Sequence, residues 1–342
     1  MGAAANARRN VCLALLLILP LSAGLARLAA VDDMDGDMCS EDMMWMIGWC
    51  LDGITGDQSL TALTASVEAT AYAGIFEPID VPGAVGTRAF GINARGDVVG
   101  SYTDATGTHG FVQSRGTITS IDYPGAATTE AWGINPRGDI IGRYTIANVA
   151  GTRGFLLSHG TYTDISMRKP DQSYHLITLP TKIGASGEIV GCFHDASSLR
   201  DMYGYVQRGS SVTTFALPTV TAPTGSAAMH NGVMPGGGVV VGLVFPTATT
   251  ARGYVVTPDT LTFVDFPGST NTQVWDVNPS GTIVGQYLGG GRTNGLYVDS
   301  EGYHTINVPA STMTVARGIN PEGDIVGVYN DASGAHGFVL RR

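Results

Sequence analysis

Short runs of apolar and β-branched residues alternate with turn-forming residues from residue 75 onward. The stretch Ala131–Gly160 shows the pattern: Trp132-Gly-Ile-Asn, then Pro-x-Gly, then Asp139-Ile-Ile-Gly-Arg-Tyr. Asn first, Pro second and Gly fourth are the residue preferences of a type I turn. Short runs rich in Val, Ile, Thr and Tyr, bounded by such turns, predict antiparallel strands joined by tight hairpins.

This strand and turn pattern repeats, and one glycine marks each copy. The glycine closes the second strand of the unit and occurs at Gly100, Gly142, Gly191, Gly242, Gly285 and Gly327. The successive spacings of 42, 49, 51, 43 and 42 residues give six copies. A period of about 40–50 residues is typical of a propeller or a solenoid.

The two ends of the repeat region complement each other. Each unit contains four extended pieces, the last of which resembles Ser120-Ile-Asp-Tyr-Pro124. The last copy stops after its third piece, at Val339–Arg342, whereas an extra fourth piece, Pro78-Ile-Asp-Val-Pro82, precedes the first copy. A circular array of four-stranded blades closes in this way, whereas a solenoid needs atypical capping repeats. We therefore predict an all-β fold, a six-bladed β-propeller of four-stranded blades whose last blade is completed by the N-terminal strand.

The repeat motif Gly-Ile-Asn, Gly-Asp-Ile-Val-Gly and His-Gly-Phe resembles the HAF-type extracellular repeats of bacterial exported proteins. The resemblance covers about residues 75–342 and is fullest in Ala89–Val112 and Ala316–Val339. The alanine in that family's name is a glycine here, at Gly110, Gly154 and Gly337. The resemblance implies export and a repeat architecture, and it supplies no catalytic residue.

Residues 1–30 have the pattern of a signal peptide. Arg8 and Arg9 precede the apolar stretch Val11–Leu21, and small residues before position 30 provide cleavage sites. That stretch is too short for a spanning helix, and no later segment approaches the roughly 20 apolar residues of a membrane span. We expect a protein that is secreted, periplasmic or on the cell surface, without a membrane span after removal of the leader.

Residues 31–74 form an acidic and Met-rich N-terminal extension that differs from the repeats. Acidic residues come first, and the apolar segment Met43–Trp49 follows. Cys39 and Cys50 lie close in sequence, and an oxidising compartment favours a disulfide between them. Cys192 is then left over inside a predicted strand, and we interpret it as a structural thiol rather than a nucleophile.

The composition excludes several classes of partner. The chain has 29 Asp and Glu against 19 Lys and Arg, which gives a formal net charge of −10. It contains no long run of Lys or Arg to displace counterions from an anionic polymer. Nucleic acid and anionic membrane surfaces are therefore not expected as partners.

Three aromatic residues are the candidates for ligand binding. Phe90, Trp132 and Trp275 share the position before Gly-Ile-Asn or its equivalent. Aromatic side chains repeated around one end of a propeller would stack on sugar rings or another apolar ligand. The alternative is that they pack between adjacent blades.

Candidates for catalysis are confined to the irregular third copy. Four residues there are the nearest approach to an acid–base group: Glu188, His194, Asp195 and Asp201. Carboxylates within one hairpin are more often solvated than catalytic. Nucleophile elbows, phosphate loops and dinucleotide fingerprints are missing, and the seven histidines show no metal-ligand spacing. We expect no cofactor and no metal.

Aspartates recur before the proline of the fourth piece, at Asp80, Asp122, Asp164 and Asp265. They would form an acidic ring able to hold a cation if they faced a central channel. They would only cap turns if the fourth piece were the outer strand.

The sequence favours an exported, non-catalytic propeller that binds a glycan or a cell-surface protein. The alternative is a secreted propeller enzyme, a lyase or hydrolase of a polysaccharide or a lactone, with its site at the channel mouth near Glu188–Asp201. Three or more carboxylate or His side chains meeting at one channel mouth would favour the enzyme.

Overall fold

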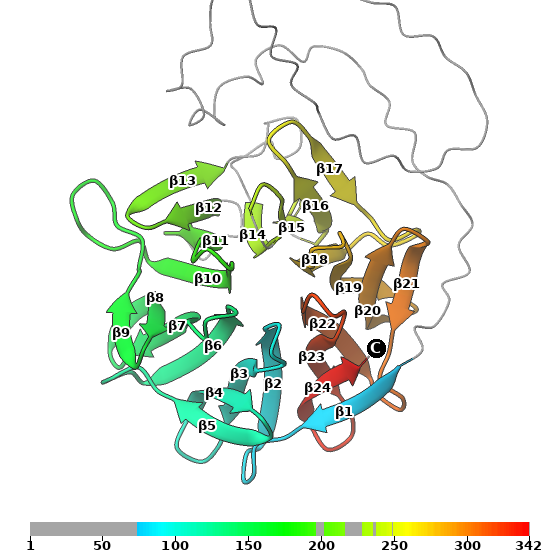
Figure 1. Cartoon of the computed structure of the whole chain (residues 1–342), viewed down its shortest axis with the longest axis horizontal. Coiled ribbons are helices and arrows are strands. Elements are labelled where there is room, and N and C mark those ends of the chain that lie inside the picture. The colour runs from blue at the N-terminus through cyan, green and yellow to red at the C-terminus, as the bar shows by residue number, and fades with distance from the viewer. Residues whose placement is uncertain (1–73, 196–201, 216–227, 235–236, 248, 342) are drawn as a thin grey trace, which may run out of the picture. The chain divides into compact units, whose positions relative to one another are not determined.

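The computed structural model describes residues 74–195, 202–215, 228–234, 237–247 and 249–341. These residues form strands β1–β24, which Figure 1 shows grouped into sheets around a common axis. Within this part of the chain, no helix is long and apolar enough to cross a membrane. The expected leader, the acidic extension, the Cys39–Cys50 disulfide and Asp201 lie outside the described residues.

The strands of each repeat follow one another from the axis outward (Figure 1). The innermost strands are β2 (Gly86–Ile92), β6 (Thr128–Ile134), β10 (Ile177–Ile183), β14 (Ala228–Val233), β18 (Thr272–Val277) and β22 (Met313–Ile319). The second strands are β3 (Val98–Thr103), β7 (Ile140–Ile146), β11 (Ile189–His194), β15 (Val240–Val244), β19 (Ile283–Gly289) and β23 (Ile325–Asn330).

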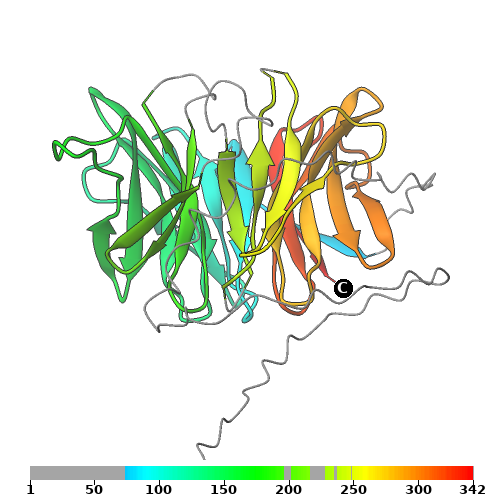
Figure 2. The same cartoon turned by 90° about the horizontal axis from the view of Figure 1, so that it is seen from above.

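The two outer positions complete each repeat. The third strands are β4 (Thr108–Ser114), β8 (Val149–Ser158), β12 (Tyr203–Arg208), β16 (Arg252–Val256), β20 (Arg292–Asp299) and β24 (Ala335–Arg341). The outer strands are β5 (Thr117–Ile121), β9 (Thr161–Asp164), β13 (Ser211–Phe215), β17 (Leu261–Val264), β21 (Gly302–Ile306) and β1 (Ile75–Ile79). Figure 2 shows that the sheets stand side by side, with loops at both ends of the strands.

Strand pairing gives an all-β propeller arrangement with four separate four-stranded sheets. They are β2–β5, β14–β17, β18–β21, and β22–β24 with β1. The six separate blades that the sequence predicts are not found, because β6–β13 form a single eight-stranded sheet. The join is a parallel contact of Ile177 in β10 with Thr152 in β8, where the Thr152 N–H donates to the Leu176 carbonyl at 2.9 Å. It arises because β8 is ten residues long and meets the chain returning to β10.

The N-terminal strand completes the last sheet, as predicted. β1 pairs antiparallel with β24 over five residue pairs, from Ile75 with Arg341 to Ile79 with Gly337. Ile79 is buried, and the rings of Phe76 and Phe338 make an edge-to-face contact at 5.6 Å. This pairing covers an edge of β24 that would otherwise present unpaired backbone groups.

The hydrophobic core lies between neighbouring sheets. Val326 and Val339 of the last sheet pack in one cluster with Ala89 and Ile92 of the first. Large residues of the third strands fill the centre of each sheet and have no exposed surface: Phe111, Phe155, Tyr205, Tyr254, Leu296 and Phe338. Contacts between sheets therefore hold neighbouring repeats together.

The asparagines at the start of the tight turns have the predicted structural role. Asn93 Oδ1 accepts hydrogen bonds from the Arg95 and Asp97 backbone N–H groups at 2.9 and 3.0 Å. The Gly96 N–H closes the turn onto the Asn93 carbonyl at 3.0 Å. Asn93 Nδ2 also donates to the carbonyl of Asn135 at 3.2 Å, so the same side chain links two successive repeats.

The glycine that marks each copy lies against the backbone of the innermost strand. A Cβ atom at Gly142 would lie 2.1 Å from the carbonyl oxygen of Glu130 and 2.7 Å from the ring of Phe155. The corresponding distance to a carbonyl oxygen is 1.9–2.2 Å at Gly100, Gly191, Gly242, Gly285 and Gly327. No side chain fits these positions, which explains the regular spacing of the glycines.

We expect Gly142→Ala to lower the free energy of unfolding by about 3 kcal/mol, because the backbone of β6 would have to move away from β7. The matched control is Gly86→Ala, whose Cβ would meet its nearest atom at an ordinary 3.5 Å. That variant should stay within about 0.5 kcal/mol of the natural protein in urea unfolding. Equal effects of the two substitutions would contradict the packing explanation.

Candidate functional site

Each innermost strand carries a β-bulge at the same position. The pairing register with the second strand shifts across one residue, for example between Ala131 and Gly133. A bulge leaves that residue unpaired and redirects its side chain. We call the six residues at this position the bulge ring: Phe90, Trp132, Thr181, Asn231, Trp275 and Arg317.

The bulge ring brings the three predicted aromatic residues together. Phe90 and Trp132 stack with ring centroids 4.5 Å apart and an interplanar angle of 17°. The ring centroids of Trp132 and Trp275 lie 6.3 Å apart, although the two residues belong to the second and fifth repeats. Because these repeats are not neighbours, their side chains reach across the axis. The aromatic residues therefore contact one another along the axis and do not only pack between adjacent sheets.

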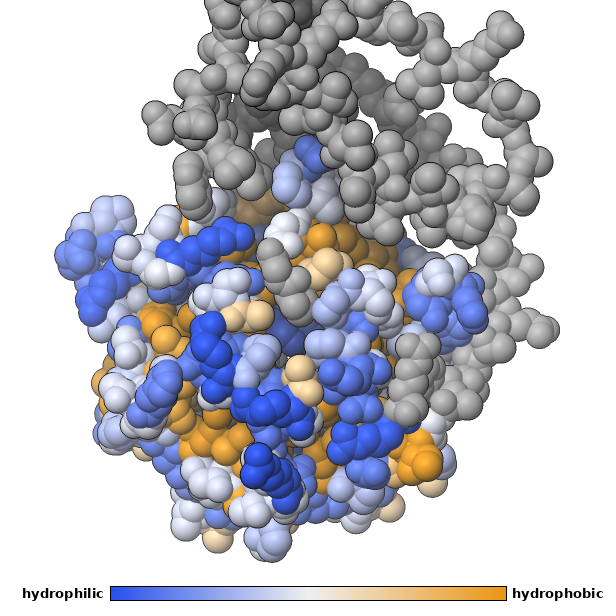
Figure 3. Space-filling view, viewed as in Figure 1, coloured by the Kyte–Doolittle hydropathy of each residue, from blue (hydrophilic) through white to orange (hydrophobic). Residues whose placement is uncertain are grey.

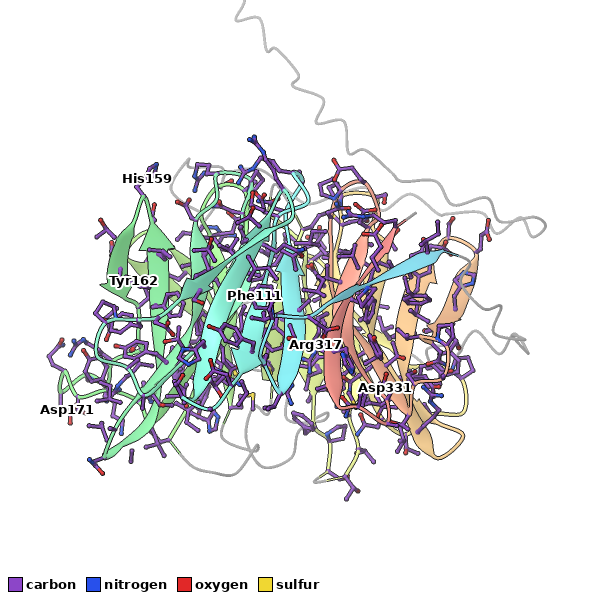
Figure 4. All side chains as sticks on the ribbon, turned by 90° about the horizontal axis from the view of Figure 1, so that it is seen from below. Phe111, His159, Tyr162, Asp171, Arg317 and Asp331 are labelled. Carbon is purple, nitrogen blue, oxygen red and sulfur yellow. The ribbon has the colours of Figure 1, made fainter. Side chains whose placement is uncertain are left out.

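Arg317 is a member of the cluster that sequence reasoning missed. Its guanidinium carbon lies 3.7 Å from the ring centroid of Trp275 and 5.8 Å from that of Trp132. Figure 4 shows it at mid-height of the sheets, between the levels of His159 and Asp331. The signal was present, because Arg317 precedes Gly-Ile-Asn just as Trp132 does.

The guanidinium of Arg317 has unused hydrogen-bonding capacity. Its Nε and Nη1 atoms are shielded from solvent and have no hydrogen-bond partner. Burial, together with the nearby positive charges of Arg143 and Arg88, lowers the pKa of Arg317 to about 9. The group therefore remains a cation at neutral pH. Shielded N–H groups of a cation that lack acceptors are costly, and an anionic group placed beside them would relieve that cost.

A carboxylate fixes the orientation of Trp132. Arg143 Nη2 donates to both carboxylate oxygens of Glu130 at 2.9 Å, and Trp132 Nε1 donates to Glu130 Oε2 at 3.1 Å. The Arg143 guanidinium also lies over the Trp132 ring at 4.8 Å. Glu130 thus holds both the indole and the cation that covers it.

A buried ion pair links three repeats beside the bulge ring. Lys182 Nζ lies 2.5 Å from Asp276 Oδ2, and these side chains are 12% and 1% exposed. Asp276 Oδ2 also accepts a hydrogen bond from the Ile319 N–H at 3.0 Å. The pair therefore connects β10, β18 and β22, and it holds the innermost strands in place around the axis.

The immediate surroundings of the bulge ring carry more positive than negative charge. The cations are Arg88, Arg143, Lys182 and Arg317, and the anions are Glu130 and Asp276. This local excess contrasts with the net charge of −10 of the whole chain. Viewed along the axis, hydrophilic residues gather near the middle of the face in Figure 3, with hydrophobic surface between them.

The aspartates of the fourth piece do not form a central acidic ring. Asp80 and Asp122 follow the outer strands β1 and β5. Asp80 Oδ1 lies 2.8 Å from His336 Nδ1, and Asp122 Oδ1 lies 2.8 Å from His109 Nδ1. The fourth piece is thus the outer strand, and these aspartates pair with residues of the third strand.

Of the predicted acid–base candidates that the structure describes, Glu188 is not brought together with His194 and Asp195. Glu188 precedes β11 and His194 ends it, so the two lie at opposite ends of the strand. Asp195 pairs with Lys169 and with His175, each at 3.0 Å. Among the described residues, no group of three or more His, Cys, Asp or Glu side chains could hold a metal ion.

Cys192 has the environment of a structural thiol. It is fully buried in a cluster with Met202, Met229 and Leu243. Burial raises the pKa of its thiol to about 12, so the thiolate is not populated near neutral pH.

No protein-family model matches the chain, and no curated protein matches it in sequence. Among solved structures, virginiamycin B lyase from Staphylococcus aureus is similar at 12% identity and a TM-score of 0.45, over 79% of this chain and 100% of the lyase chain. A mutant of the Aleuria aurantia lectin AAL in complex with Fucα1-6GlcNAc is similar at 10% identity and a TM-score of 0.48, over 78% of this chain and 97% of the lectin chain. TolB from Acinetobacter baumannii is similar at 12% identity and a TM-score of 0.44, over 78% of this chain and 56% of the TolB chain. Similarity at this level carries no argument about ligand or activity.

We expect Asp276→Asn to lower the free energy of unfolding by about 3–5 kcal/mol, because it leaves the Lys182 ammonium buried without a counter-charge. Adding Lys182→Met to Asp276→Asn should recover part of the loss, since the unpaired charge is then removed. Chemical unfolding measures both effects, and Asp259→Asn on an exposed turn serves as the control. If Asp276→Asn were as stable as Asp259→Asn, the proposed role of the ion pair would be contradicted.

His230 makes stability depend on pH. It is 2% exposed, and burial lowers the pKa of its imidazole to about 3. Because this is below the unfolded value, the stabilising effect is complete above about pH 6.5 and is lost as the pH falls toward 3. We expect a loss of about 1.4 kcal/mol per pH unit below pH 6. Unfolding of His230→Gln between pH 6 and 5 should lack this slope, whatever its absolute stability.

Proposed function

We propose that this protein is a non-catalytic binding protein whose bulge ring holds an acidic glycan, a sugar chain that carries carboxylates. The observation that carries the proposal is the Arg317 guanidinium, which stacks on Trp275 and has two shielded nitrogens without an acceptor. A ligand carboxylate would accept a charge-assisted hydrogen bond from one of these two nitrogens.

The aromatic side chains support a sugar as the rest of the ligand. Trp132 and Trp275 are half-buried residues of the bulge ring. The apolar face of a sugar ring packs on an indole, while its hydroxyls remain free for polar contacts. The local excess of positive charge would attract an anionic chain in a protein that is acidic elsewhere. These features together favour an acidic glycan over a cell-surface protein as the ligand.

We infer that the fold contains six repeats and that the eight-stranded sheet represents two of them. A single residue pair joins β8 to β10, whereas six pairs join β10 to β11. The leader pattern and the resemblance to HAF-type repeats support export of the chain. A binding site for extracellular polysaccharide is consistent with that destination.

Oligogalacturonate and a neutral galacto-oligosaccharide of matched length are the probes for this proposal. The acidic chain should bind the natural protein in calorimetry and change its tryptophan fluorescence, and the neutral chain should bind at least tenfold more weakly. Arg317→Met should weaken binding of the acidic chain at least tenfold, because it removes charge-assisted hydrogen bonds. The control is Arg115→Met on an exposed turn, which should bind normally.

Equal binding of the two sugars, or normal binding by Arg317→Met, would refute the proposed site. The same samples should be assayed for shortened or unsaturated products. Turnover of the acidic chain would instead support the alternative function, a secreted polysaccharide lyase or hydrolase.

A further inference from the structure

The first two repeats hold a buried carboxylate in the turn after the innermost strand. Asp139 is 7% exposed, and its Oδ2 accepts from Asn135 Nδ2 at 2.8 Å and from Arg137 Nε at 3.0 Å. Its Oδ1 accepts from Ser158 Oγ at 2.6 Å. Burial alone would raise the pKa of Asp139, and these hydrogen bonds lower it overall. The first repeat has the same arrangement around Asp97, with donors Asn93, Arg95 and Ser114.

The arginine of each of these turns also reaches the next repeat. Arg137 Nη1 donates to the Ala185 carbonyl in the third repeat at 2.6 Å. Arg95 Nη1 likewise donates to the Pro136 carbonyl in the second repeat. A guanidinium therefore occupies the space between successive turns, paired with a buried carboxylate on one side and with a backbone carbonyl on the other.

The third repeat keeps the backbone of this turn but lacks the asparagine, arginine and serine that donate to the carboxylate in the first two repeats. The Gly184 N–H donates to the Glu188 carbonyl at 2.8 Å, and the Gly187 N–H donates to the Gly184 carbonyl at 3.0 Å. Gly184 stands in place of the asparagine, and Ser186 stands in place of the arginine. Arg208 occupies the strand-end position at which the first two repeats carry serine.

Glu188 is consequently a buried carboxylate without a donor. It is 4% exposed, and neither Oε1 nor Oε2 has a hydrogen-bond partner. It lines a cavity of about 240 Å³ between the third and fourth repeats, together with Ser186, Arg208 and Gly237. A carboxylate in this state is costly unless a cation pairs with it.

We propose that this cavity binds the guanidinium group of a small ligand of the arginine type. The ligand guanidinium takes the place that the arginine side chain fills in the two preceding turns, and Glu188 accepts its hydrogen bonds. The Arg208 side chain on the cavity wall pairs with the carboxylate of a free amino acid. This site is separate from the bulge ring and does not depend on the function proposed for it.

L-Arginine and L-citrulline are the first probes, because citrulline has nearly the same shape but no positive charge. Arginine should bind the natural protein in calorimetry at least tenfold more tightly than citrulline. Glu188→Gln should lose the arginine signal. Equal binding of arginine and citrulline would overturn the proposal.

A second experiment fills the cavity from within the chain. Ser186→Arg restores the arginine of the preceding turns, so it should raise Tm by about 2 °C or more and abolish the response to arginine. The matched control is Ser186→Met, which places a side chain of similar length at the same position without a guanidinium group. If the two substitutions have the same effect on Tm, the proposal fails.

Agmatine, which lacks the carboxylate of arginine, tests the role of Arg208. Arg208→Ala should weaken arginine binding and leave agmatine binding unchanged. A gain in agmatine affinity of tenfold or more in Arg208→Ala would show that Arg208 itself fills the cavity in solution, and it would refute the proposed ligand site.

Discussion

A close backbone contact within each sheet determines where side chains point along the axis. In every repeat the glycine of the second strand faces a carbonyl of the innermost strand at a distance that no Cβ could occupy. The bulge residue lies two positions after the residue that carries this carbonyl, as Trp132 lies two positions after Glu130. The contact therefore fixes the position of the bulge but not the identity of the residue there. A uniform scaffold can in this way present a different side chain from each repeat.

The sequence determines the strands, the turns and the closure because these depend on local and periodic signals. Asn93 and Gly96 identify a turn by their own conformational preferences, and the extra piece Pro78–Pro82 identifies the strand that completes the last sheet. Phe90, Trp132 and Trp275 could be grouped because they share one position in the repeat. Their mutual contacts across the axis could not be predicted, because these depend on how far the bulges turn the side chains.

Other features depend on relations between repeats that periodicity does not encode. Arg317 occupies the same position as Trp132, yet three of the six residues there are not aromatic, and the role of Arg317 becomes visible only through its distance to Trp275. The merged sheet follows from the length of β8 and from the route of the chain after it. The isolation of Glu188 becomes visible only when its turn is compared with the same turn of the first two repeats. There, three side chains donate to the carboxylate, and the third repeat lacks all three of these residues.

Equivalent polar residues are fully hydrogen-bonded in one repeat and lack hydrogen-bond partners in another. In the second repeat Asp139 is satisfied by its own turn and by Ser158, whereas in the third repeat the equivalent carboxylate is left without partners. In the outer layer, His336 and His109 each pair with an aspartate at 2.8 Å, at equivalent positions of the last and first repeats. Departure from the repeat thus marks the Glu188 cavity, whereas a shared position in the repeat marks the bulge ring.

The seam between β1 and β24 also sets an order of assembly. The two strands that form it are the first and the last among the strands of the described residues, and they are separated by the whole repeat region. Inner hairpins can form as soon as their own residues are synthesised, but β1 has no partner until β24 has emerged. The last sheet is therefore completed in a late step, and until then β1 lacks its partner strand.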